Sequence, residues 1–141
     1  MTTTDYFTKW IEAIPTRQAT NSVIISFIEN NLLSRFGCPH KIITDNATAF
    51  KSKKMISFCH KYHITLGHST AYYPQDNGLA ESSNKSLVNI IKKLLQENKK
   101  TWNKKLVYAL WADRLAIKKS IGTYPYQLVY GMDVVFPYSL A

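Results

Sequence analysis

The alternation of short apolar segments with amphipathic helices is the feature that most limits how this chain can fold. Residues 41–44 (KIIT) and 64–68 (ITLGH) have the composition of short strands, and a helical pattern over residues 52–62 separates them. Strands joined through a helix run parallel in one sheet and need helices on its faces. The order of elements therefore predicts an α/β fold around a mixed sheet.

The first fifteen residues predict an incomplete hairpin. Residues 1–4 tolerate an extended backbone, residues 5–9 have turn composition, and residues 10–14 alternate well enough for a strand that Pro15 ends. This hairpin begins part-way through its first strand. We therefore expect a chain that is truncated at its N-terminus.

Helix boundaries follow from capping residues. Ser and Thr offer side-chain oxygens to the first free N–H groups of a helix, and Gly permits the left-handed turn after its last residue. The expected helices run from Thr20 or Asn21 to Gly37, from Ser52 to about Tyr62, from about Glu81 to Leu95, from Thr101 onward, and, as a short helix or turn, from Tyr126 to Gly131.

The helix that begins near Glu81 has two unlike faces. At about 3.6 residues per turn, one face is apolar and made of Leu87, Ile90, Ile91, Leu94 and Leu95. The side that carries Glu81 also carries Asn84, Lys85, Val88 and Lys92. A carboxylate flanked by lysines is suited to holding a cation beside a phosphate backbone. The alternative is an ordinary surface helix whose charges are solvated.

The charge balance indicates a polyanionic partner. Eighteen Lys and Arg against nine Asp and Glu give a formal net charge of +9 over 141 residues, which makes nucleic acid the first candidate. The sequence contains no apolar run of about twenty residues, and its N-terminus lacks the pattern of a secretory signal. We therefore expect no membrane partner. We also expect no small-molecule substrate.

The two cysteines, Cys38 and Cys59, allow at most one disulfide. Without an export signal we expect free, buried thiols. Cys59 lies close to His60 and His63, but a zinc site needs four ligands in recognised pairs, and no second pair accompanies them. We expect these three residues to be ordinary helix residues.

Two acidic residues occupy positions where active-site residues of α/β sheets commonly lie. Asp45 directly follows the strand at residues 41–44, and Glu81 begins a helix shortly after the strand at residues 64–68. Thirty-five residues lie between them.

With this order of elements, that spacing resembles the D,D(35)E catalytic core of retroviral and retrotransposon integrases. More closely, six segments resemble the integrase of gypsy-type LTR retrotransposon polyproteins: DYFTKWIEAIP, RFGCP, ITDNATAF, YYPQDNGLAESSNK, ALWADR and YPYQLVYG. These segments are spread over almost the entire chain, from Asp5 to Gly131. The resemblance implies an RNase H-like fold with a five-stranded mixed sheet and helices on both sides.

The resemblance also implies the site and its chemistry. Three carboxylates of the family hold two divalent ions, Mg²⁺ or Mn²⁺, which favour hard oxygen ligands. The ions act on DNA phosphodiesters, first in trimming the element's end and then in strand transfer. Asp45 matches the second ligand and Glu81 the third. The implied DNA contacts are Lys85, with Lys92 on the same face, and more weakly Asn84 and Gln75.

The first catalytic Asp of the family has no counterpart among these residues. In the family it belongs to a strand one hairpin upstream of DYFTKW, and the resemblance implies that this strand and most of the second are missing from these 141 residues. Asp5 would complete a triad in name, but its position predicts a turn residue that caps backbone amides. We therefore expect a catalytically impaired core.

Smaller departures indicate relaxed constraint. Ala47 and Asp76 stand where the family usually has Gly, which gives loops access to left-handed backbone conformations. Asp113 replaces a common aromatic residue. These residues indicate a decaying or truncated element.

Taken as a single domain, residues 1–141 are expected to form a truncated integrase core without the zinc-binding domain or the C-terminal DNA-binding domain of a complete integrase. The expected partner is DNA, with a homodimer through the core helices, and the family's compartment is the nucleus, or otherwise the cytoplasm. The alternative function is that of a non-catalytic relic that binds DNA through basic residues or acts as a dimerisation module.

Overall fold

The structure is a computed structural model that describes residues 1–45, 47–68, 78–95 and 99–133. Its chain divides into two compact units. The first contains Met1 and residues 14–81, and the second contains residues 2–13 and 82–141.

The first unit begins with a helical segment in three parts: α1 (Asn21–Phe27), the π-helix η1 (Ile28–Leu33) and α2 (Ser34–Phe36). Thr20 caps α1, because its side chain accepts a hydrogen bond from the N–H of Val23, as the sequence predicts. The wider π turns rotate each residue less about the helix axis. The predicted apolar face therefore falls out of phase after η1, and Phe36 is 47% exposed.

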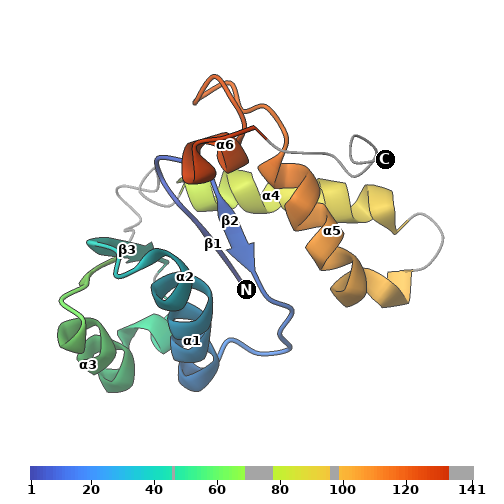
Figure 1. The fold of residues 1–141 in the computed structure, drawn as a ribbon. Coiled ribbons are helices and arrows are strands. Elements are labelled where there is room, and N and C mark those ends of the chain that lie inside the picture. Colours follow the sequence, from blue (N-terminus) through green and yellow to red (C-terminus); the bar gives the residue numbers. More distant parts are fainter. Residues whose placement is uncertain (46, 69–77, 96–98, 134–141) are drawn as a thin grey trace. The chain divides into compact units, whose positions relative to one another are not determined.

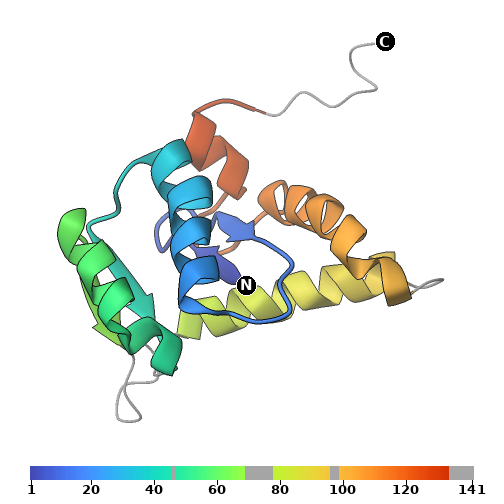
Figure 2. The same ribbon diagram turned by 90° about the horizontal axis from the view of Figure 1, so that it is seen from below.

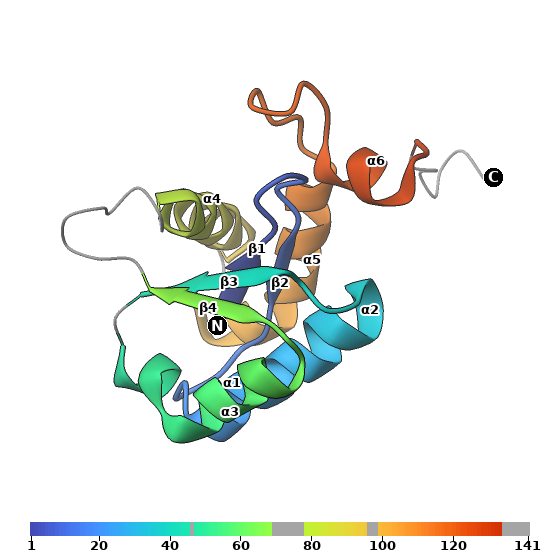
Figure 3. The same ribbon diagram turned by 90° about the vertical axis from the view of Figure 1, so that its left-hand side faces the viewer.

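Two parallel strands follow in the same unit. β3 (Lys41–Thr44) is joined to β4 (Thr65–His68) through the 3-10 turn η2 (Thr48–Lys51) and helix α3 (Lys53–Lys61). Ser52 caps α3 by accepting a hydrogen bond from the N–H of Met55. Figure 3 shows β3 and β4 side by side, with α1 and α3 along one side of the pair.

The core of this unit lies between α1, α3 and the two strands. Figure 2 shows α1 and α3 next to each other. The buried residues are Ile24, Phe27, Ile28, Met55, Phe58, Cys59 and Ile64. Burial raises the pKa of the Cys59 thiol. Cys38 is a free thiol as predicted, but it is exposed, so the prediction of a buried site for Cys38 is wrong.

The second unit combines an antiparallel hairpin with helices (Figure 1). Strands β1 (Thr2–Thr4) and β2 (Ile11–Ala13) pair with Thr3 opposite Glu12. The helices are α4 (Gly78–Leu94), whose first four residues belong to the other unit, α5 (Trp102–Arg114) and α6 (Pro125–Tyr130), with the 3-10 turn η4 (Lys99–Thr101) before α5. Gly131 ends α6 in the left-handed conformation, as predicted.

The core of the second unit packs β2 against α4 and α5. Its buried residues are Ile11, Ala13, Leu87, Leu106, Ala109 and Leu110, with Ile90 and Ile91 against them. The apolar face predicted for α4 is thereby confirmed at its centre. At its end, Leu94 is 41% exposed.

Trp10 lies at the centre of a buried network that joins three segments quoted in the sequence analysis. The Trp10 side chain is 5% exposed, its Nε1–H donates to Glu12 (2.8 Å), and its ring stacks edge-on with Tyr130 (5.7 Å between centroids). The Arg114 guanidinium lies 4.2 Å from the Trp10 ring and donates to Glu12 (3.1 Å). The segments DYFTKWIEAIP, ALWADR and YPYQLVYG therefore contact each other through Trp10, Arg114 and Tyr130.

Asp113 is also a structural residue. Its side chain is fully buried, and one carboxylate oxygen is 2.5 Å from the Lys118 ammonium. Asp113, which was expected to reflect relaxed constraint, thus has an ion-pair partner five residues later in the chain.

The outward face of α5 carries large apolar side chains. Tyr108 and Trp111 on this face are 54% and 49% exposed, and Trp102 in the first turn of the helix is 42% exposed. None of the described helices is both long and apolar enough to span a bilayer.

Candidate active site

Asp45 lies at the carboxyl end of β3, where the sequence predicts it. Asp45 is exposed, and its carboxylate oxygen Oδ1 accepts a hydrogen bond from the N–H of Ala47 (2.9 Å). Because β3 and β4 are parallel in register, Thr44 and His68 end the two strands at the same edge.

Ala47 does not need the conformational freedom of glycine. Its backbone has φ −59° and ψ 138°, which any residue adopts. The replacement of Gly by Ala is therefore accommodated at this position, and it gives no evidence of relaxed constraint. Asp76 lies outside the described residues.

Glu81 lies in the first turn of α4, in the same compact unit as Asp45. Its side chain is outside the described part of the structure, and so is the whole of Gln75. Both remain predictions as site residues.

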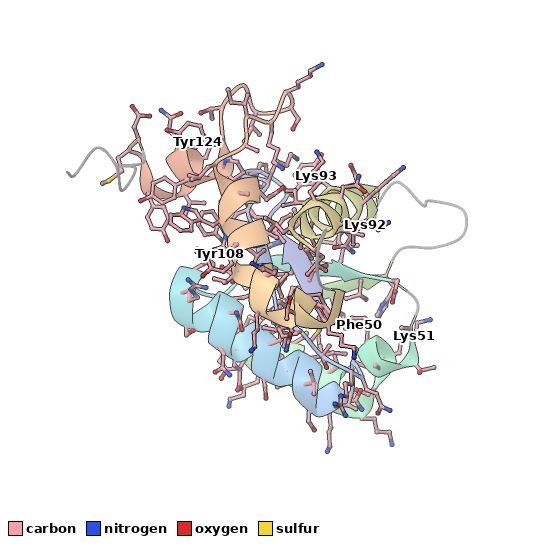
Figure 4. All side chains as sticks on the ribbon, turned by 90° about the vertical axis from the view of Figure 1, so that its right-hand side faces the viewer. Phe50, Lys51, Lys92, Lys93, Tyr108 and Tyr124 are labelled. Carbon is pink, nitrogen blue, oxygen red and sulfur yellow. The ribbon has the colours of Figure 1, made fainter. Side chains whose placement is uncertain are left out.

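The polar face of α4 beyond Glu81 is open to solvent. Lys85 and Lys92 are exposed, as a phosphate contact requires, and Figure 4 shows Lys92 and Lys93 on α4. Asn84 is exposed too, but its Oδ1 accepts a hydrogen bond from the Thr2 hydroxyl of β1. Asn84 therefore also has a local structural role.

Asp5 is a turn residue, as the sequence predicts. Its Oδ2 accepts from both the N–H (2.8 Å) and the hydroxyl (2.6 Å) of Thr8, and its main-chain N–H and C=O bond to Trp10 and Lys9. The carboxylate thus holds the β1–β2 turn, with Lys9 in the left-handed region at φ 61°.

The described side chains fit a hard divalent cation in part. The donor at the sheet edge is a carboxylate oxygen, the ligand type that Mg²⁺ prefers. Among the residues whose side chains the structure describes, no three His, Cys, Asp or Glu side chains gather in a possible metal site.

His68 is the residue at this edge that sequence reasoning missed. Its Nδ1 is 2.9 Å from the Thr44 hydroxyl. The signal was available, because His68 ends the strand predicted to run parallel to residues 41–44, and the carboxyl ends of such strands meet.

Sequence comparisons identify relatives of this chain. A sequence model of the "Integrase core domain" family matches residues 1–74. The Gag-Pol polyprotein of avian reticuloendotheliosis virus is 32% identical over 128 residues, which are 91% of this chain and 11% of the polyprotein. That of baboon endogenous virus (strain M7) is 34% identical over 90% of this chain and 7% of its own length. The chain thus spans only a small part of these relatives.

Solved structures share the fold. A chain of the simian T-cell lymphotropic virus intasome, determined in complex with the PP2A regulatory subunit B56 gamma, has a TM-score of 0.82 and 25% identity over 92% of this chain and 47% of that one. The HTLV-2 integrase catalytic core domain, in complex with magnesium, has a TM-score of 0.69 and 28% identity over 88% and 79%.

These likenesses confirm the RNase H-like fold class predicted from the sequence. The prediction of one five-stranded mixed sheet is not met among the described residues, whose strands form two separate pairs, antiparallel β1–β2 and parallel β3–β4. The gypsy-type subgroup stays a prediction. The family match over more than half of the chain, together with the retroviral polyproteins and the shared fold, shows that this chain belongs to the integrase core domain family.

Proposed function

We propose that Asp45 and Glu81 hold a divalent cation, Mg²⁺ or Mn²⁺, at a site that acts on DNA phosphodiesters. The reactions would be end trimming by water and strand transfer by the resulting 3′-hydroxyl. The observation that carries the proposal is the exposed Asp45 carboxylate at the carboxyl edge of the parallel β3–β4 pair, in a chain of the integrase core family. The magnesium complex of the HTLV-2 core supports the choice of cation.

Bound divalent ions would stabilise charge on the attacking and leaving oxygens of the displacement. The chain's own residues would bind and orient. Asp45 offers a carboxylate oxygen from a position fixed by its turn, and the exposed Lys85 and Lys92 offer ammonium groups to the phosphate backbone.

The direct test mixes the purified chain with Mg²⁺ or Mn²⁺ and a labelled element-end oligonucleotide. We expect metal-dependent trimming that Asp45→Asn abolishes and Asp5→Asn leaves intact, because Asp5 only holds a turn. Trimming that survives in Asp45→Asn, or that is lost in Asp5→Asn, would contradict the assignment of the ligands.

The second candidate function is a non-catalytic DNA-binding module. The observation in its favour is the set of lysines that are exposed along α3, α4 and α5: Lys53, Lys54, Lys85, Lys92, Lys93 and Lys104. Phosphate contacts of this kind are sequence-independent and weaken steeply with salt. DNA binding that is salt-sensitive and sequence-blind, without trimming by any variant, would identify this function instead.

We also propose that a second copy of the chain covers the outward face of α5. Val107, Tyr108 and Trp111 are 62%, 54% and 49% exposed on this face, while Leu106 and Leu110 are buried on the other. Figure 4 shows Tyr108 on α5. The dimeric and trimeric forms of the HTLV-2 core support self-association.

Sedimentation equilibrium at micromolar concentrations tests this surface. We expect the wild-type chain to dimerise and Tyr108→Ser/Trp111→Ser to shift the chain to monomer, because two buried aromatic contacts are lost. Ile117→Ser is the matched control, since Ile117 is 76% exposed and outside α5. A double variant that associates as strongly as the wild type would refute this interface.

A further inference from the structure

Thr44 and His68 form a side-chain pair across the edge at which Asp45 lies. They are register partners and the last residues of β3 and β4. Thr44 is 7% exposed, so its hydroxyl is removed from water and depends on partners within the protein.

The two hydrogen bonds of the Thr44 hydroxyl have only one mutually consistent direction. Its Oγ1 is 2.9 Å from His68 Nδ1 and 3.1 Å from the main-chain carbonyl oxygen of Asp45. The carbonyl can only accept, and the hydroxyl has one proton. Both bonds are therefore made when the hydroxyl donates to Asp45 and His68 Nδ1–H donates to the hydroxyl.

This direction produces a continuous chain of donors from His68 through Thr44 to Asp45. The Thr44 hydroxyl thus holds the main chain of Asp45, and the N–H of Ala47 holds its side chain by bonding Oδ1. Asp45 is itself exposed, and it begins a loop outside the strand ladder. Its orientation therefore depends on these few local bonds.

We propose that His68 is a positioning residue for Asp45, acting through the Thr44 hydroxyl. This inference rests on the proposed function, in which Asp45 is a ligand of a divalent cation. Groups that orient metal ligands in this way are typically worth about 10- to 100-fold in metal affinity. His68 thereby sets the affinity of the site without touching the cation.

The probe is Mn²⁺ alone, titrated into the full chain and followed by the electron paramagnetic resonance signal of the free ion. We expect His68→Leu and Thr44→Val each to weaken binding by about tenfold or more. His68→Asn retains an N–H donor close to the place of Nδ1 and should recover most of the affinity. His68→Gln, which extends its amide by one methylene, should recover less.

The double variant Thr44→Val/His68→Leu distinguishes a shared route from two separate effects. Because both changes break the same chain of bonds, the double variant should bind Mn²⁺ about as weakly as either single variant. Urea unfolding of each variant measures fold stability separately, and we expect His68→Asn and His68→Gln to have similar midpoints despite different affinities.

Wild-type Mn²⁺ affinity in His68→Leu or Thr44→Val would overturn the proposal, as would equal affinities of His68→Asn and His68→Leu. These outcomes differ from failure of the proposed function, which would appear as wild-type affinity in Asp45→Asn.

Discussion

Replacing Lys118 with Met should lower the free energy of unfolding by about 3–5 kcal/mol, the usual cost of removing one partner from a buried ion pair. The Asp113 side chain is fully buried, and Lys118 Nζ lies 2.5 Å from its Oδ1. The other oxygen, Oδ2, has no hydrogen-bond partner within the described part of the chain. Without Lys118, the carboxylate would be left buried and uncompensated.

Urea unfolding at pH 7, followed by circular dichroism, measures this effect. Lys119→Met is the matched control, because Lys119 is exposed and should change stability by less than about 0.5 kcal/mol. The pair Asp113→Leu/Lys118→Met should be less destabilised than Lys118→Met alone, since no charge is then left buried. If the Lys118→Met chain were as stable as the control, the buried Asp113–Lys118 pair would not contribute to the free energy of unfolding.

Replacing Trp10 with Ala should cost about 3–5 kcal/mol, the range for removing a large buried aromatic side chain. Trp10 is 5% exposed, and its ring contacts Arg114 and Tyr130. Its Nε1–H is also a donor to Glu12, which is 2% exposed. The substitution therefore removes apolar contacts and one hydrogen bond to a buried carboxylate.

Trp10→Phe separates the two contributions. Phe keeps an aromatic ring, although a smaller one, and has no N–H, so we expect a smaller cost of about 1–3 kcal/mol, in which the weakened Glu12 network is included. Trp102→Ala is the control at a tryptophan that is 42% exposed, and it should cost less than about 1 kcal/mol. Equal stabilities of Trp10→Ala and Trp102→Ala would contradict this expectation.

Local patterns in the sequence were enough to predict most elements. Thr20 and Ser52 cap α1 and α3 as expected, and Gly131 ends α6. These features depend on one or two neighbouring residues, which a sequence displays directly. The position of Asp45 followed for the same reason, because it comes straight after a recognisable strand.

Features that depend on tertiary contacts were missed. The π-helix η1 changes the phase of the apolar repeat, so Phe36 is exposed. The apolar stripe of α5 has two possible sides, and composition does not say which side packs on β2. Asp113 was expected to reflect relaxed constraint. Its ion-pair partner, Lys118, was missed because Lys118 lies beyond the end of the helix.

The recognised motifs carry more structural than chemical information. Trp10, Arg114 and Tyr130 come from three different motifs and meet in one buried network. Motif resemblance thus predicted the fold through core contacts, whereas the proposed chemistry rests on Asp45 and Glu81. A test of Asp45 and Glu81 must therefore measure metal binding separately from the stability of the fold.

Mn²⁺ binding by the full chain, followed by electron paramagnetic resonance, is the most direct test of the central claim. The account predicts that the wild type and Asp5→Asn bind Mn²⁺ alike. It predicts that Asp45→Asn and Glu81→Gln each bind at least about tenfold more weakly, a loss of about 1.4 kcal/mol or more. Wild-type affinity in both Asp45→Asn and Glu81→Gln would contradict the proposed metal site.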